Sequence, residues 1–317
     1  VAAQVAGAPP RLAVGLESPH NKPMSHPVIF DRALLRARRA RAAQLGAETF
    51  LIDRVAEDLA VRLSAVLRRF DVAADVGTPT DAVRRAMAGR VGTVVAVDPG
   101  AQGDKALTVA ADEEALPFRD GSLDLAVSAL ALQFVNDLPG TLIQIRRALK
   151  PDGLFLAALI GGDSLAELRA AFAQAESEVE GGVSPRVAPF ADLRDLGALL
   201  QRAGFALPVT DIDRVTVRYS SPLSLMHDLR RMGATNVLTE RRRKPLRRAT
   251  LQRLFEIYAD RFADADGRIR ATFEIVWLSG WAPHESQQQP LKPGSAKTRL
   301  ADALRTAELP AGEKAGR

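Results

Sequence analysis

The stretch Ala73–Asp81, with the sequence AADVGTPTD, decides the fold prediction for this chain. Its apolar start predicts a buried strand that ends at Asp75 and Gly77, and a short helical pattern follows. Such a strand–loop–helix unit is typical of nucleotide-type cofactor loops, because glycine lets the backbone approach the ligand closely. Further glycines are usual in these loops, but Pro79 and Asp81 stand in their places. The stretch therefore predicts a cofactor loop with an incomplete glycine pattern.

Around this loop, short apolar segments alternate with helical patterns. Strands are predicted at residues 72–76, 93–98, 107–111, 123–128, 154–160, 209–219 and 271–278. Helices are predicted at residues 31–45, 48–69, 81–89, 137–149, 164–178, 190–203, 222–232 and 249–262. Strands that are apolar on both faces belong to parallel sheets covered by helices. The sequence thus predicts an α/β fold of the Rossmann-like type, with helices on both faces of the sheet.

Composition limits the class of protein. The 317 residues are 47% hydrophobic and 26% charged, which suits one large globular domain. Cysteine is absent, which excludes disulfides, thiolate metal sites and a cysteine nucleophile. No apolar run is long enough for a transmembrane helix. We expect a cytoplasmic protein. We also expect no metal site, since no histidine–acid pair suggests an iron triad.

The domain is expected to span residues 28–282. Residues 1–27 are rich in Ala, Pro and Gly and are predicted to be disordered. The polar segment 283–317 is predicted to be a flexible tail.

Polar side chains follow several of the predicted strands. Asp75, Asp98, Asp112 and Ser128 all stand at or just beyond the carboxyl end of a strand. Ligands of open α/β sheets bind at this edge. One acid at a strand end is usually a helix cap or a solvated group. Several in order favour a binding site.

Longer motifs resemble a known family. Residues 111–118 (ADEEALPF), 121–125 (GSLDL) and 149–153 (LKPDG) look like the later motifs of class I S-adenosylmethionine-dependent methyltransferases of the type 11 group. Six further motifs resemble the branch that contains mitochondrial complex I assembly factor 5 and bacterial malonyl-acyl-carrier-protein methyltransferase-like proteins. They are 29–32 (IFDR), 135–139 (VNDLP), 161–169 (GGDSLAELR), 184–190 (SPRVAPF), 232–236 (MGATN) and 284–287 (HESQ).

The resemblance implies S-adenosylmethionine as the cofactor. It implies that Asp75 and Gly77 hold the methionine part, Asp98 the ribose and Asp112 the adenine. Glu113 and Ser128 join the candidate cofactor-binding residues because they follow the third and fourth predicted strands. No catalytic residue is identified.

The same resemblance predicts details of the architecture. It implies an antiparallel last strand, N-terminal helices within 28–70 and a helical insertion at 220–265. Two departures from the family concern the cofactor side. Pro79 lacks a backbone donor and Asp81 adds a negative charge near the cofactor carboxylate. The link 99–106 is too short for the usual helix after the second strand.

Two functions remain open from the sequence. The first is transfer of a methyl group from S-adenosylmethionine to an unidentified acceptor. The alternative, implied by the resemblance, is an assembly factor for respiratory NADH dehydrogenase, either a protein-arginine hydroxylase or a non-catalytic interaction protein. Phe118, Leu130 and Phe134 are interpreted as core rather than as a cofactor platform. His227 is interpreted as a solvated or packing residue.

A run of basic residues between positions 241 and 248 is the densest cluster of charge in the chain. It contains Arg241, Arg242, Arg243, Arg247 and Arg248. The run predicts either a docking site for an acidic protein or a solvated helix start. Few aromatic residues interrupt it, which argues against nucleic acid as the partner.

Overall fold

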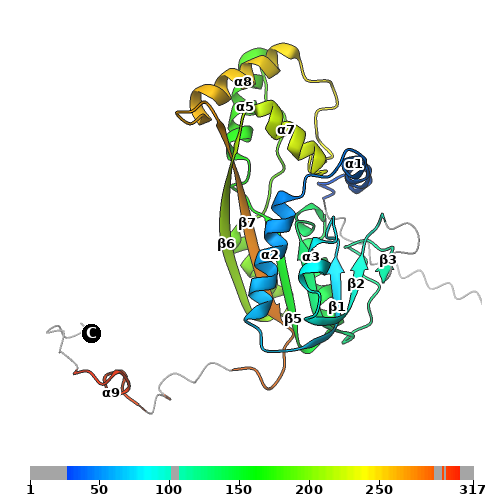
Figure 1. Ribbon diagram of the computed structural model, residues 1–317, viewed down its shortest axis with the longest axis vertical. Coiled ribbons are helices and arrows are strands. Elements are labelled where there is room, and N and C mark those ends of the chain that lie inside the picture. Colours follow the sequence, from blue (N-terminus) through cyan, green and yellow to red (C-terminus); the bar gives the residue numbers. More distant parts are fainter. Residues whose placement is uncertain (1–26, 101–106, 289–294, 296–297, 308–317) are drawn as a thin grey trace, which may run out of the picture.

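The computed structural model describes residues 27–100, 107–288, 295 and 298–307, and a single mixed sheet forms its centre (Figure 1). Seven strands of the described residues lie in the order β3-β2-β1-β4-β5-β7-β6. They are β1 Phe70–Val76, β2 Val91–Val97, β3 Thr108–Val109, β4 Leu123–Ala129, β5 Leu149–Ile160, β6 Ala206–Tyr219 and β7 Ile269–Trp281. Strands β1 to β5 pair in parallel, and β7 runs antiparallel to both β5 and β6. The predicted α/β fold with an antiparallel last strand is confirmed.

Helices cover both faces of the sheet. Those of the described residues are α1 Arg32–Gln44, α2 Phe50–Ser64, α3 Ala82–Ala86, the 3-10 helix η1 Leu132–Phe134, α4 Leu138–Ala148, α5 Ala166–Glu180, α6 Leu193–Arg202, α7 Pro222–Arg231, α8 Arg248–Phe262 and α9 Leu300–Leu304. One buried cluster packs α2 and α3 on the sheet, and a second packs α4 and α6. Helices α7 and α8 form the insertion between β6 and β7, and α8 lies beside α5 above the sheet (Figure 1). None of the described helices is long and apolar enough to cross a membrane.

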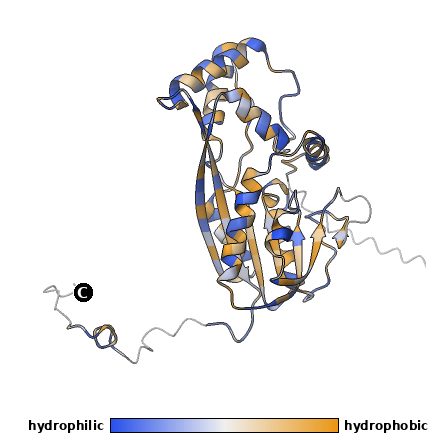
Figure 2. Cartoon of the chain, viewed as in Figure 1, coloured by the Kyte–Doolittle hydropathy of each residue, from blue (hydrophilic) through white to orange (hydrophobic). Residues whose placement is uncertain are grey.

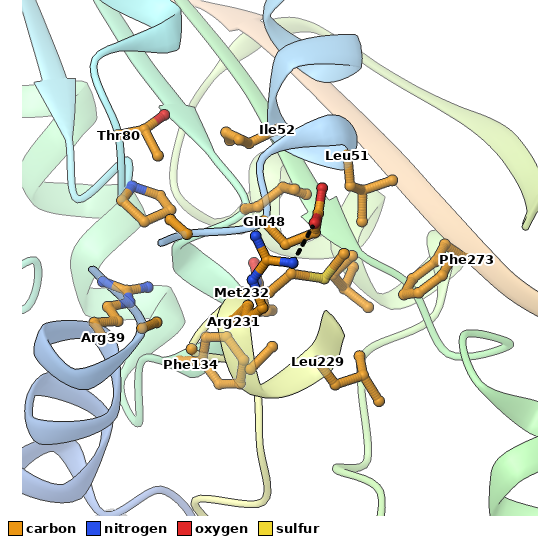
Figure 3. Close-up of a pocket in the computed structure, with 18 of the residues that line it drawn as sticks. Arg39, Glu48, Leu51, Ile52, Thr80, Phe134, Leu229, Arg231, Met232 and Phe273 are labelled. Carbon is orange, nitrogen blue, oxygen red and sulfur yellow. Dashed lines mark ion pairs between the residues drawn. The ribbon is translucent and has the colours of Figure 1, made fainter. Parts of the chain in front are cut away.

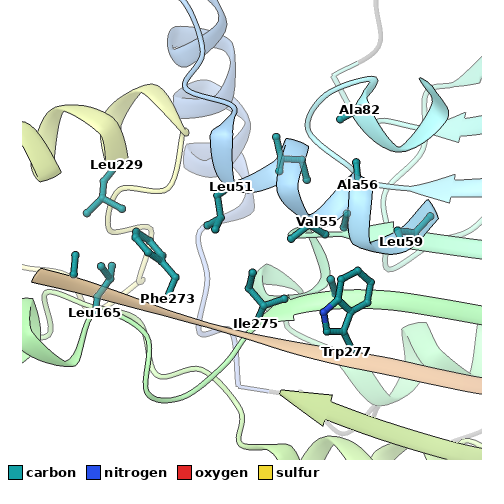
Figure 4. Close-up of a cluster of buried hydrophobic side chains, with 14 of the residues drawn as sticks. Leu51, Val55, Ala56, Leu59, Ala82, Leu165, Leu229, Phe273, Ile275 and Trp277 are labelled. Carbon is teal, nitrogen blue, oxygen red and sulfur yellow. The ribbon is translucent and has the colours of Figure 1, made fainter. Parts of the chain in front are cut away.

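Helix α2 shows how the sequence pattern becomes packing. Val55 and Leu59 are four residues apart, so they lie on one face of the helix, and both are fully buried. That face meets Ile275 and Trp277 of β7 in one apolar cluster (Figure 4). Hydropathy also differs between the strands of the sheet. The central strands are largely apolar, whereas polar and apolar residues alternate along the edge strand β6 (Figure 2).

Element lengths differ from the prediction for physical reasons. Strands β6 and β7 extend past 209–219 and 271–278, because they form one long antiparallel pair whose register runs from Tyr219↔Ile269 to Ala206↔Trp281. Strand β3 is shorter than 107–111, because it lies at the sheet edge and pairs with β2 alone. Helix α3 stops at Ala86 rather than residue 89, and Gly89 follows with a positive φ of 78°.

Some predictions fall partly outside the described residues. The predicted disordered segment 1–27 includes residues 1–26, and most of the short link 99–106 also lies outside the description. Within the predicted tail 283–317, α9 forms one short helix.

Candidate cofactor site and adjoining cavity

The glycine loop lies at the point where the strand order reverses. Strand β1 is flanked by β2 on one side and β4 on the other, so the loop after β1 stands at the switch point where open α/β sheets bind ligands. Gly77 has a φ of 73°, a conformation that glycine adopts without strain. Its N–H donates a 2.9 Å hydrogen bond to the carbonyl of Val97 at the end of β2. The loop after β1 is therefore anchored to the end of β2.

Asp75 carries an incompletely paired carboxylate in this loop. The residue is 1% exposed, and its Oδ2 lies 3.0 Å from Arg84 Nη1 of α3. Its Oδ1 is buried and has no hydrogen-bond partner among the described residues. Burial raises the pKa of Asp75 to about 6, against the opposing effects of Thr78 and Arg84. Buried polar atoms are nearly always paired, so this oxygen fits a site that a ligand's donor completes.

The two departures from the glycine pattern take different positions. Asp81 is exposed and forms an ion pair with Arg85 one helical turn later. The expected negative charge near the cofactor is thus largely balanced by Arg85 at the surface. Pro79 lies at the wall of the cavity described below, as does Thr80.

The carboxylates that follow β2 and β3 both accept hydrogen bonds within the protein. Asp98 is exposed, and its Oδ1 accepts a 2.8 Å hydrogen bond from the N–H of Gly100. Asp112 Oδ1 accepts from the N–H of Glu114 at 3.0 Å and from Arg32 Nη2 at 2.8 Å. Asp112 therefore caps a turn, which is the ordinary role of an acid at a strand end, and also pairs with α1.

Glu113 lies against the glycine of the loop. Its side chain is 1% exposed and pairs with Arg32, and Arg39 Nη1 stands 3.7 Å from its Oε1. A Cβ placed on Gly77 would stand 2.5 Å from Glu113 Oε1. The sequence identified Glu113 but not its arginine partners. Their positions in a basic helix, on one helical face, were the signal that could have identified them.

The Ser128 side chain forms a hydrogen bond within the protein. Its buried hydroxyl donates a 2.7 Å hydrogen bond to the carbonyl of Val76. Thr78 Oγ1 accepts from the N–H of Ala129 at 3.1 Å. These two bonds join the end of β4 to the glycine loop, so Ser128 helps to hold the loop in place.

A mainly apolar cavity of about 140 Å³ adjoins the loop (Figure 3). Its walls come from α1, α2, the glycine loop, η1 and the end of α7, and they include Leu130 and Phe134. Phe134 is buried in edge contact with Phe30, as predicted for core, yet it also faces this space. Glu48 and Arg231 form a 3.3 Å ion pair at the cavity.

Neither His227 nor a metal-binding cluster belongs to this cavity. His227 is absent from its lining. In the described ranges, no group of three or more His, Cys, Asp or Glu side chains is placed to hold a metal ion.

The basic run divides into paired and exposed arginines. Arg241 Nη2 lies 3.3 Å from Asp31 Oδ2, and Arg242 pairs with Glu180. Both arginines thus join the insertion to other helices. Arg243, Arg247 and Arg248 are exposed, with Arg247 Nε only 4.0 Å from Glu180.

Comparison with known proteins identifies the family. The chain is 37% identical to "Arginine-hydroxylase NDUFAF5, mitochondrial" of Danio rerio over 89% of its own length and 91% of that protein. The Homo sapiens protein of that name is 37% identical over 90% of this chain and 86% of its own.

The chain belongs to the NDUFAF5 family.

The methyltransferase resemblance is also confirmed. A family model described as "Methyltransferase domain" matches residues 74–157 of this chain, the part that runs from β1 into β5. The Malonyl-[acyl-carrier protein] O-methyltransferase of Laribacter hongkongensis is 39% identical over 59% of this chain and 60% of that protein. Among solved structures, the YcgJ protein of Bacillus subtilis superposes with a TM-score of 0.48 at 15% identity, over 71% of this chain and 98% of that one.

One prediction is corrected by these relatives. The NDUFAF5 proteins of Danio rerio, Homo sapiens and Mus musculus are mitochondrial, so the expectation of a cytoplasmic protein is contradicted.

Proposed function

We propose that this protein binds S-adenosylmethionine beside Gly77 and transfers its methyl group to an acceptor that enters the adjoining cavity. The observation that carries the proposal is the unpartnered, buried Oδ1 of Asp75 beside that glycine. A cationic amino group is a suitable donor for this oxygen. Asp98 has an exposed carboxylate for ribose hydroxyls, and Asp112 follows β3 where the resemblance assigns the adenine.

The cavity provides the acceptor side of the reaction. Pro79 and Thr80 belong both to the glycine loop and to the cavity wall, so the cavity adjoins the loop. When bound, the cofactor supplies a sulfonium-linked methyl group, which an acceptor lone pair takes up as the methyl–sulfur bond breaks and the electron pair stays on sulfur. The protein's task is to hold the acceptor in line with that bond.

The cavity also limits the type of acceptor. Its volume of about 140 Å³ is close to that of an engineered cavity of about 150 Å³ that holds benzene. It therefore accommodates the end of a larger molecule. Its ionisable lining residues are Arg39, Glu48 and Arg231, and Arg231 engages Glu48. An acceptor that is nucleophilic without a base, such as a carboxylate, fits these walls best.

Calorimetry with S-adenosylmethionine tests the proposal. We expect the wild type to bind and Asp75→Asn to bind at least about tenfold more weakly, because a charged hydrogen-bond acceptor is lost. Asp81→Asn is the matched control in the same loop and should change the affinity by less than about twofold, since its carboxylate pairs with Arg85 at the surface. No binding by the wild type at millimolar ligand refutes the proposal.

Hydroxylation of a protein arginine is a second candidate. The near full-length similarity to the arginine hydroxylase NDUFAF5 favours it, because the malonyl-carrier methyltransferase matches over a smaller share of the chain. A role in assembling respiratory NADH dehydrogenase belongs to the same candidate. Mass spectrometry of co-purified proteins separates the two chemistries, since a methyl adds about 14 Da and an oxygen about 16 Da to the modified residue. Failure to enrich any dehydrogenase subunit would count against the assembly role.

A further inference from the structure

Helix α1 presents three arginines to the acids that follow β3. Arg32, Arg36 and Arg39 recur at the spacing of one helical face. Arg32 pairs with both Asp112 and Glu113. Arg36 Nη1 lies 3.5 Å from Asp112 Oδ2, and Arg39 Nη1 lies 3.7 Å from Glu113 Oε1. The helix is thereby held over the cofactor side of the sheet by charge.

The Glu113 side chain lies in the space that the glycine loop leaves open. Its Oε1, Cγ and Cδ all stand within 2.9 Å of the position that a Cβ on Gly77 would take. Absence of a side chain at that glycine is the feature that admits a ligand to such loops. Asp75 also lies at the loop with one unpaired oxygen. In this arrangement a carboxylate of the protein occupies the approach to Gly77.

Arg39 connects this carboxylate with the cavity. Its side chain is 19% exposed, and it lines the same cavity as Pro79 and Thr80. Burial lowers the pKa of Arg39, whereas Glu113 opposes that shift. A largely buried guanidinium left without a counter-charge is strongly unfavourable. If Glu113 moves away, Arg39 therefore needs another anion.

We propose that Glu113 competes with the ligand for the space beside Gly77, and that Arg39 exchanges the Glu113 carboxylate for a carboxylate of the ligand. The inference rests on the proposed binding of S-adenosylmethionine, whose amino-acid part bears such a group. A ligand with the same nucleoside but no carboxylate displaces Glu113 without replacing its charge. The site therefore selects for the complete amino-acid end of the ligand.

Calorimetry with two ligands tests the exchange. The probes are S-adenosylhomocysteine and 5′-methylthioadenosine, which share the nucleoside thioether and differ by the amino-acid group. We expect Glu113→Ala to bind both ligands at least about tenfold more tightly than the wild type, because both displace Glu113. The wild type should prefer S-adenosylhomocysteine over methylthioadenosine, and Arg39→Met should lose most of this preference, because only the homocysteine carboxylate pairs with Arg39. Glu113→Gln keeps the bulk and loses the charge, so its gain should be intermediate. Asp120→Asn removes an exposed ion pair with Arg147 in the same loop and should leave both affinities within about twofold.

Two outcomes overturn the inference. Equal or weaker binding of S-adenosylhomocysteine by Glu113→Ala shows that Glu113 does not compete with the ligand. An unchanged preference for S-adenosylhomocysteine over methylthioadenosine in Arg39→Met shows that Arg39 does not exchange carboxylates.

Hydrogen exchange supplies a readout without ligand. Backbone amides of α1 should exchange at least about tenfold faster in both Glu113 variants than in the wild type, because the helix loses its buried ion pairs. Asp120→Asn should leave them unchanged. Unchanged exchange of α1 in Glu113→Gln overturns the inference even if Glu113→Ala folds poorly. Absence of S-adenosylhomocysteine binding in every variant refutes the proposed function instead, and the exchange comparison still decides whether Glu113 holds α1.

Discussion

The hydroxyl of Ser128 donates a 2.7 Å hydrogen bond to the main-chain carbonyl of Val76, and this bond joins the end of β4 to the end of β1 directly before the glycine loop. We expect Ser128→Ala to lower the free energy of unfolding by about 0.5–1.5 kcal/mol, because it removes a buried hydrogen bond. Urea denaturation measures the loss. Ser122→Ala, which removes an exposed hydroxyl bound to the carbonyl of Arg119, should cost less than about 0.5 kcal/mol. Equal costs for the two variants would show that the buried bond contributes nothing.

Asp75 predicts a pH dependence of stability. Its folded-state pKa of about 6 exceeds the ordinary value of 3.8, so the folded state holds more protons than the unfolded state between these values. Stability from this group therefore falls as pH rises from about 4 to about 6. Asp75→Asn removes the titration. Relative to this variant, the wild type should lose about 2–3 kcal/mol between pH 4 and pH 7.5, as about two pKa units imply. A difference in unfolding free energy that is constant with pH would contradict the raised pKa.

Gly77 and Glu113 should be energetically coupled. Gly77→Ala introduces a Cβ at a positive φ and against the Glu113 side chain, so it costs backbone strain and a steric contact. In a Glu113→Ala background only the strain remains. A double-mutant cycle measured by denaturation should therefore give a coupling of about 1 kcal/mol or more.

Gly121 provides the matched control for this cycle. It also has a positive φ of 64°, but no atom lies within 4 Å of the position that a Cβ on Gly121 would take. Gly121→Ala should cost strain alone and show no coupling with Glu113→Ala. Coupling at Gly121 but not at Gly77 would contradict the contact.

Truncating a buried side chain of helix α2 should lower the free energy of unfolding, because it weakens the packing of the helix on the sheet. Leu59 is fully buried, so Leu59→Ala should cost about 2–5 kcal/mol through lost burial and a new cavity. Val61 on the same helix is 67% exposed, and Val61→Ala should cost less than about 0.5 kcal/mol. Thermal or urea unfolding of both variants checks the difference, and similar costs would contradict the packing face.

The basic run should separate into structural and surface arginines. Arg242 pairs with the nearly buried Glu180, so Arg242→Ala should lower the unfolding free energy by at least about 1 kcal/mol. Arg243→Ala should leave stability within about 0.5 kcal/mol, because that side chain is exposed. If an acidic protein docks on this surface, Arg243→Ala should weaken its binding in a salt-dependent manner. Loss of stability in Arg243→Ala would contradict this division.

Much of the fold could be predicted from residue patterns. The apolar runs around Ala74, Ala126 and Phe155 identified central strands, because a parallel strand covered on both faces must be apolar throughout. The lengths of β3 and β6 could not be predicted, since they depend on which neighbour each strand pairs with.

The candidate site was only partly predictable. Asp75 and Gly77 were found because the end of a strand and a glycine are visible in one short segment. The sequence marked Ser128 by position alone, and the structure shows its hydroxyl turned to Val76. Arg32 and Arg39 lie in the predicted helix 31–45, but no local pattern indicates which acids this helix meets.

The sequence by itself determined the strand and helix pattern, the glycine loop and the motifs that reveal the family, because each is written within a short stretch of chain. Only the tertiary structure decided that Glu113 lies on Gly77, that α1 pairs with the acids after β3, and that a cavity opens beside Pro79. Arg32 and Glu113 are 81 residues apart, and periodicity tells which face of an element is buried but not what lies opposite it. Packing of α1 and α2 over the sheet brings those distant charges together.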